Sequence, residues 1–501
     1  MPDPTTFALL TRHVRAIRNC IEPWYAAFLL ANLVMGTSSV LIPLKLDRVL
    51  EQGPGQLGIL STLASAAAVL GSLLWGRLSD AAHRRKAFVV VSSLMVGVAH
   101  AGLAVSTTFV GLALFNTLLS FFWIANASVA VLLVIERKED AAWEASISSL
   151  NLSGALGWLL GLVAGGVGVG VAMSALSERG GIQALLMGLS GLGFVAAGLG
   201  AWLIPATEPV FTERRFRGVM IAVGNLLVEA WKFNPLHLYH RLSLRRLVAL
   251  RRETRLFLLA SALAFTGIAF FAVPLALLLS QRLGYPPALV FYGYVMLHSG
   301  IVLAYPFALQ RIKQRGNRRV QLGALSARVI LFALGAGALW LVPDLPWVAV
   351  APFLLVVGLT WSFFQLSGVA LASRLAKPEN RGLALGTYNA IAGASTAVAG
   401  VSSGYLAQHA GHHVTYAVAA SLLLGAVAVL WRLPDPVVPQ AERGGDAGTP
   451  PTSQMKARAL RPRCSTKTRG SVPSTPSLRL GSPSREELSR MCTSEGRAAK
   501  G

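Results

Sequence analysis

The residues of this sequence best suited to bind a ligand are polar and aromatic side chains that lie inside long apolar segments. Rings supply apolar contact and amides orient a bound molecule, which suits an uncharged or amphiphilic organic solute. Polar groups are costly inside a membrane and tend to mark a pathway there. The candidate substrate-binding residues are Asn32, Thr37, Asn116, Trp123, Asn126, Asn151, His298, Trp361 and Gln365.

Helical spacing supports treating these residues as groups. Asn116, Trp123 and Asn126 recur at intervals of 7 and 3, which places them on one helical face. Trp361 and Gln365 lie 4 residues apart and share a face in the same way. For any single residue the simpler explanation is a hydrogen bond between helices, worth about 0.6 kcal/mol on average. As a set, the residues predict a cavity.

His298 is the one member of this set that titrates near neutral pH. All 22 acidic residues can be placed outside the apolar segments or at their ends, so no carboxylate is available at mid-depth. Proton coupling would therefore depend on His298. An equally supported alternative is a packed imidazole that donates to a neighbouring carbonyl.

A short charged connection, WGRLSDAAHRRKAF at residues 75–88, joins two of the apolar segments. Asp80 can pair with a helix N-terminus or with Arg137, and such a contact would hold one arrangement of the helices. The basic residues also serve as a topology signal, which is the simpler interpretation for them. The predicted gating loop and latch consist of Gly76, Leu78, Asp80, Arg84, Arg85 and Arg137.

Twelve apolar segments must position these side chains. The chain has 501 residues, 54% of them hydrophobic, and a mean hydropathy of +0.57, which are typical values for an integral membrane protein. About 20 mostly apolar residues cross a hydrocarbon core as a helix. The predicted spans are residues 23–45, 57–76, 87–106, 109–134, 147–172, 182–204, 256–280, 288–309, 320–342, 347–372, 383–407 and 413–432.

The distribution of positive charge predicts the topology. With the N-terminus in the cytoplasm, 40 of the 45 Lys and Arg residues lie on the inner side, as the positive-inside rule expects. The net charge of +23 is thereby explained by the basic residues that set the orientation of the chain in the membrane, and we expect no nucleic-acid partner. The sequence predicts a multi-pass protein of the plasma (inner) membrane with both termini in the cytoplasm.

The fold class that follows is an all-α integral membrane protein with twelve transmembrane helices in two six-helix halves. A basic segment separates the halves, and within it residues 218–231 are too short to span and are expected to form an interfacial helix. The tail is rich in Pro, Ser, Gly and Arg and is expected to be disordered. The predicted divisions are residues 1–22 (N-terminus), 23–204 (first half), 205–255 (cytoplasmic linker), 256–432 (second half) and 433–501 (tail).

Stripes of glycine indicate that the halves echo each other. Superimposing the fifth span on the eleventh so that Gly154 meets Gly393 also brings other glycines into register. Small residues let helix backbones approach closely in lipid. Weak internal symmetry of this kind is typical of transporters built from two repeats. The predicted helix-packing glycines are Gly154, Gly157, Gly161, Gly165, Gly166, Gly386, Gly393, Gly400 and Gly404.

Several of these motifs resemble those of the major facilitator superfamily. The connection at 75–88, with Gly-x-Leu-x-Asp followed by two arginines, is similar to that family's signature loop between helices two and three. The glycines of 157–166 resemble a motif on its fifth helix, and PENRGLALGTYNAIAG at 378–393 is similar to the start of its eleventh helix. The likeness covers about residues 23–432 and implies a twelve-helix transporter.

Three residues depart from the family pattern. Ala81 stands where a basic residue is usual, His83 where glycine is usual, and Leu162 where the antiporter motif has proline. The resemblance therefore implies the fold and the general mechanism, and it does not imply antiport.

These observations predict a secondary active transporter, or permease, and not an enzyme. It would move a small organic solute, with efflux of a drug-like molecule as one form, by alternating access. We expect no cofactor or metal, contacts with membrane lipids, a monomer, and protons as the candidate coupling ion. The alternatives are a facilitator without ion coupling, a transporter-like sensor or scaffold that uses the basic tail, and a membrane-embedded enzyme. The enzyme alternative is supported by a single cluster of histidines close together in the sequence, His409, His412 and His413.

Overall fold

The computed structural model describes residues 22–82, 85–137, 143–205, 251–342, 344–375 and 381–433. Within these ranges twelve helical spans are long and apolar enough to cross a membrane, which confirms the predicted number and all-α class. The helices are α2 (Tyr25–Arg48), α3 (Pro54–Ala82), α4 (Arg85–Val105), α5 (Phe109–Arg137), α6 (Trp143–Ala175), α7 (Glu178–Leu203), α11 (Arg252–Ala272), α12 (Leu275–Leu277), η2 (Leu278–Arg282), α13 (Pro287–Arg315), α14 (Asn317–Leu341), α15 (Trp347–Leu375), α16 (Arg381–Ala410) and α17 (His412–Trp431).

The seventh span is interrupted near one end. α11 stops at Ala272, Pro274 precedes the short α12, and the π-helical turn η2 completes the span. Proline lacks the N–H that an α-helix needs at its interior positions, so the break falls where the sequence places Pro274. Short π-helical turns are frequently found at functional sites.

Two ends of the bundle can be distinguished by following the chain. We call the end at which α2 begins and α17 ends the terminal end, and the opposite end the far end. The α2–α3, α6–α7 and η2–α13 connections lie at the far end, because successive spans run in alternate directions.

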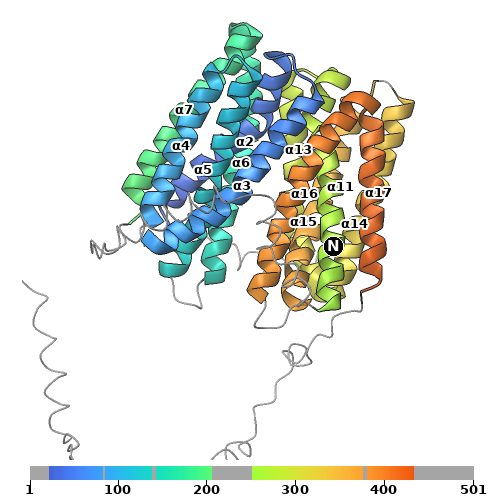
Figure 1. Cartoon of the computed structure of the whole chain (residues 1–501). Helices are drawn as coiled ribbons and strands as arrows, with labels where there is room; N and C mark the ends of the chain where they lie inside the picture. Colours follow the sequence, from blue (N-terminus) through green and yellow to red (C-terminus); the bar gives the residue numbers. More distant parts are fainter. Residues whose placement is uncertain are drawn as a thin grey trace, which may run out of the picture. The chain divides into compact units, whose positions relative to one another are not determined.

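The six helices of residues 25–203 pack mainly with one another, as do those of residues 252–431 (Figure 1). In the first half α2 packs on α6 and α7, and α3 on α5; in the second half α11 packs on α16 and α17, and α13 on α15. Two pairs join the halves most extensively, α3 with α16 and α6 with α13. A ligand pathway between the halves must therefore be bordered by these pairs.

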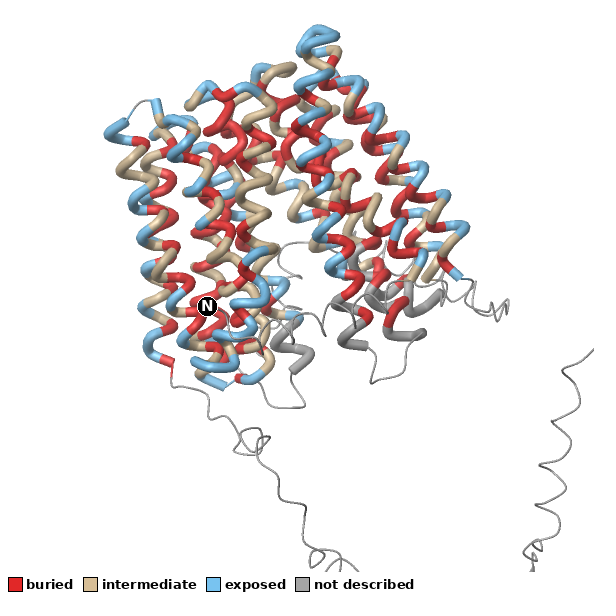
Figure 2. The backbone as a smooth tube through the Cα atoms, turned by 180° about the vertical axis from the view of Figure 1, so that it is seen from behind, coloured by how far each residue is buried: buried red, intermediate tan, exposed pale blue. Residues whose placement is uncertain are grey.

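Apolar side chains cover the outside of the bundle as well as its core. Figure 2 shows buried and exposed stretches alternating along the helices. Large apolar residues such as Val110, Trp202 and Val348 are at least 74% exposed. Lipid tails rather than water suit such surfaces, since every backbone polar group of a helix is already paired internally.

The two glycine stripes pack against different neighbours. A Cβ atom at Gly161 would lie 2.1 Å from the Leu33 carbonyl oxygen, so this stripe of α6 packs closely on α2 of its own half. A Cβ atom at Gly404 would lie 2.3 Å from the Pro54 oxygen, so this part of the α16 stripe packs on α3 of the other half. Gly386 is exposed and a Cβ atom there would have no atom within 4 Å, so its predicted packing role is wrong. Stripes that superimpose in sequence therefore serve different interfaces.

Three predicted segments lie outside the described residues. These are residues 1–21, the linker at 206–250 with its expected interfacial helix, and the tail from 434 onward. The predicted domain divisions remain predictions there.

Candidate functional site

A cavity of about 320 Å³ lies between the two halves, near the middle of the spans. It is lined by α2, α5 and α6 from the first half and by α13 from the second. Its lining residues are Phe28, Asn32, Trp123, Asn151, Gly154, Ala155, Trp158, His298, Ile301 and Val302.

The lining is aromatic and polar but carries no acidic, Lys or Arg side chain. Asn32 is held by its own helix, because its Nδ2 donates to the Phe28 carbonyl at 2.8 Å, which leaves the amide oxygen free to accept. Asn151 is exposed, as is Ala155 one turn further along α6. This arrangement can bind a flat apolar ring while offering hydrogen bonds from amides.

Gly154 keeps room for these groups. A Cβ atom at this position would lie 2.9 Å from the Phe28 ring and 3.4 Å from both amide atoms of Asn32. The glycine predicted to pack helices thus also shapes the cavity.

A pair of stacked rings joins the halves at the cavity. Trp158 of α6 lies 6.1 Å from His298 of α13, centroid to centroid, with 22° between the ring planes. His298 is fixed in turn by Tyr294, whose carbonyl accepts from Nδ1 at 2.9 Å and whose ring lies 6.5 Å away. With Nδ1 donating, Nε2 is left to accept a hydrogen bond or a proton.

The cavity lies on the terminal-end side of this stack. Phe28 and Asn32 are in the first third of α2, Asn151 is in the first third of α6, and Ile301 follows His298 toward the terminal end of α13. On the far-end side the halves pack closely, since a Cβ atom at Gly165 would lie 2.4 Å from the Phe291 ring. The stack therefore separates the cavity from the tight contacts of the far end.

Three of the predicted binding residues use their polar groups between helices. Thr37 donates to the Gly161 carbonyl at 2.6 Å, and Asn126 donates to Ser93 Oγ at 3.0 Å. Asn116 reaches the Leu60 carbonyl at 3.5 Å. The predicted set therefore divides: Asn32, Trp123, Asn151 and His298 line the cavity, whereas these three join helices.

Trp361 and Gln365 lie away from the cavity lining, within the second half. The Arg328 guanidinium carbon lies 5.5 Å from the Trp361 ring, and Arg328 Nη2 donates to the Val357 carbonyl at 3.0 Å. Arg328 is only 2% exposed, so it does not extend to the membrane surface as an arginine on a long flexible stem otherwise would. A cation–π contact helps to accommodate the buried charge.

The predicted gating loop is described only in part. Leu78 is buried in a small cluster with Trp75 and Ala125. The burial of Gly76 and the side chains of Asp80 and Arg137 lie outside what the structure describes, as does the whole of Arg84, while Arg85 is half-buried at the start of α4. The predicted Asp80–Arg137 pair remains a prediction.

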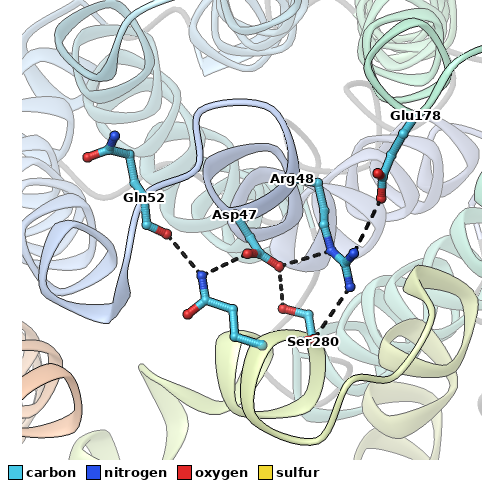
Figure 3. A network of polar contacts seen from close by, with 6 residues as sticks. Asp47, Arg48, Gln52, Glu178 and Ser280 are labelled. Atoms are coloured by element: carbon cyan, nitrogen blue, oxygen red, sulfur yellow. Dashed lines mark hydrogen bonds and ion pairs between the residues drawn. The ribbon is translucent and has the colours of Figure 1, made fainter.

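A polar network at the far end was not predicted (Figure 3). Asp47, at the end of α2, accepts from Ser280 Oγ at 2.5 Å and from Gln281 Nε2 at 2.7 Å, and both donors belong to η2 of the other half. Arg48 Nε lies 3.2 Å from Asp47 Oδ2, and Arg48 Nη1 lies 3.8 Å from Glu178 Oε1. The only sequence signal was a set of polar residues at the ends of the first and seventh spans.

Among the described residues no group of three or more His, Cys, Asp or Glu could hold a metal ion.

Comparison with known proteins places these features in a family. The sequence matches the model of the Major Facilitator Superfamily over residues 24–367 and 324–468. A search of curated proteins found no match.

Several solved structures share the fold at low sequence identity. The nucleoside transporter NupG is 14% identical with a TM-score of 0.63, covering 82% of this chain and 98% of that one. A bacterial homolog of the human lysosomal transporter Spinster is 10% identical with a TM-score of 0.63, covering 83% and 97%. A D-xylose-proton symporter is 14% identical with a TM-score of 0.62, covering 82% and 97%.

Proposed function

Because the chain belongs to the major facilitator superfamily, we propose that it is a secondary transporter that moves a small organic solute by alternating access. The observation that carries the proposal is the cavity of about 320 Å³, which is lined from both halves and bordered on one side by a stacked pair of rings, one from each half. A site at the interface of two repeats becomes accessible from alternate sides when the halves rock.

The lining favours an uncharged or amphiphilic solute. Trp123 and Trp158 offer ring faces, Asn32 and Asn151 offer amides, and no fixed charge is present to compensate an ionic substrate. A drug-like molecule exported from the cell is compatible with this chemistry.

The distribution of positive charge predicts which end of the bundle faces the cytoplasm. Since Lys and Arg residues concentrate on the terminal end, that end is proposed to face the cytoplasm, in the plasma membrane, and the cavity of this state to face inward.

His298 is the proposed coupling residue. It is the one lining side chain with an ionisable group, and its Nε2 is not used by the bond to Tyr294. The competing proposal is a facilitator that uses no ion.

The test is solute flux into reconstituted vesicles with and without an imposed pH gradient, screened over uncharged and charged organic solutes. Trp123→Ala should lower flux of the transported solute about tenfold, because a ring face lining the cavity is lost. Trp202→Ala, which removes a side chain 79% exposed on the outside of α7, is the matched control and should leave flux unchanged. Equal loss in both variants, or no flux of any solute by the wild-type protein, would contradict the proposal.

A further inference from the structure

We propose that Asp47 is a latch that holds the two halves together at the far end and so decides which end of the cavity is open. The inference rests on the proposed alternating access and adds the residue that governs it. The latch comprises Asp47 with its two donors, Ser280 and Gln281, and the flanking Arg48 (Figure 3).

The contacts cross from one half to the other. Asp47 belongs to α2, whereas Ser280 and Gln281 belong to η2, more than 230 residues later in the chain. Gln281 Nε2 also donates to the Gln52 carbonyl at 3.2 Å. Two consecutive side chains of the seventh span are thus bound to the end of the first span.

Burial makes these contacts costly to lose. Asp47 is 8% exposed and Ser280 is 3% exposed, so neither group can readily exchange its partner for water while the halves stay together. Hydrogen bonds to an ionised group are roughly twice as strong as neutral ones. A buried carboxylate that kept its charge without these donors would be strongly disfavoured.

The network is anchored on the first-half side. Arg48 pairs with Asp47 at 3.2 Å and with Glu178 of α7 at 3.8 Å, and its Nη2 reaches the Ser280 carbonyl at 3.4 Å. Arg48 belongs to the same half as Asp47, so when the halves separate the carboxylate would meet water beside a cation rather than as a lone charge. A contact of this kind can open and close repeatedly.

The latch at the far end has a predicted counterpart at the terminal end of the bundle. The segment predicted to gate the molecule, around Asp80, lies in the last turns of α3 at the terminal end, whereas Asp47 lies at the far end. With Asp47 bound, the far end is closed and the cavity lies toward the terminal end. Release of Asp47 is therefore the step that permits opening to the far side.

The experiment measures from which side the cavity can be reached. Ala155, an exposed lining residue, is replaced by cysteine in a full-length protein whose native cysteines, Cys20, Cys464 and Cys492, are changed to serine. A membrane-impermeant maleimide is added to sealed vesicles of known protein orientation, so that each end is exposed to the reagent in turn. The ratio of the two labelling rates reports the balance between far-open and terminal-open states.

Asp47→Asn should raise the far-side labelling rate of residue 155 roughly tenfold and lower the terminal-side rate. Both carboxylate oxygens accept hydrogen bonds, so an amide must turn its NH₂ group toward one of the donors. Ser280→Ala should shift the ratio in the same direction by a smaller factor. Glu51→Gln removes an acidic residue four positions away that forms no contact in this network and is the matched control.

A purely structural role for Asp47 would lower the melting temperature without changing the ratio. That outcome, or the same shift in Glu51→Gln, would overturn the latch. If Asp47→Asn does not fold, the ratio of the two labelling rates is measured in Ser280→Ala and Gln281→Ala instead. If wild-type flux is normal but no variant shifts the ratio, the latch fails while the transport proposal stands. If the wild-type protein shows no flux, the transport proposal is contradicted, and the labelling ratio still tests the latch.

Discussion

His298 is proposed to combine two roles that a substitution can separate. Its ring stacks on Trp158 and Tyr294, while Nε2 is the site available for a proton. His298→Phe keeps a ring at this position and removes both nitrogens. We expect downhill solute flux to fall less than tenfold and accumulation driven by a pH gradient to disappear.

The measurement is uptake into vesicles with and without the gradient. His409→Phe, on α16 outside the cavity lining, is the control and should retain accumulation. Undiminished accumulation in His298→Phe would mean that the histidine only packs.

Sequence reasoning reached part of the binding site at this scale. Asn32, Trp123, Asn151 and His298 line the cavity, but the stripe that contains Trp123 also includes Asn126, which donates to Ser93. A helical face wide enough to carry three polar residues touches both the lumen and a neighbouring helix. Spacing alone does not show which neighbour each side chain meets. Trp158 was missed because an indole on a glycine-rich helix looks like ordinary packing.

The glycines of α6 allow a test at the scale of the helix. A Cβ atom at Gly161 would meet the Leu33 carbonyl at 2.1 Å, and backbone atoms cannot yield cheaply. Gly161→Ala should therefore destabilise the α2–α6 contact by about 1–3 kcal/mol. Gly170→Ala on the same helix has no atom within 4 Å of the new Cβ and serves as the control.

Thermal unfolding of the purified protein measures the effect. The melting temperature should fall in Gly161→Ala and stay unchanged or rise slightly in Gly170→Ala, since alanine has the higher helix propensity. Equal melting temperatures in the two variants would show that α2 and α6 do not pack as described.

The helices themselves were the most predictable part of the fold. All twelve spans follow from hydropathy, because a bilayer demands about 20 apolar residues for each crossing. Pairing between helices was harder to foresee. Gly161 and Gly400 align in sequence, yet Gly161 packs on α2 within its half and Gly400 packs on α3 across the halves. The spacing of small residues predicts a close contact but carries no information about the partner.

At the scale of the whole molecule, several polar contacts between the halves lie toward the far end within the part of the chain that the structure describes. Besides Asp47, Thr62 Oγ1 donates to the Ala397 carbonyl at 2.5 Å, and the Gly55 N–H donates to Gln408 Oε1 at 3.0 Å. These residues lie at the beginning of α3 and toward the end of α16. Hydropathy could not reveal them, because each contact pairs residues more than 330 positions apart.

Because of this arrangement, some substitutions should change the stability of one half, and others should change the balance between far-open and terminal-open states. Gly161 packs within a half, which is proposed to move as a unit, whereas Gly404 packs between the halves at the far end. A Cβ atom at Gly404 would lie 2.3 Å from the Pro54 carbonyl oxygen and 2.9 Å from the Gly58 Cα atom. Gly404→Ala should therefore push α3 and α16 apart at the far end while leaving each half intact.

The expected result is a several-fold rise in far-side labelling of a cysteine at position 155, with little change in melting temperature. Gly161→Ala should show the opposite pattern, a lower melting temperature with an unchanged labelling ratio. The two variants add the same methyl group to glycines of similar helices, so the contrast depends only on which interface each occupies. Matching effects in both variants would mean that the halves do not move as separate bodies, and alternating access about this cavity could not operate.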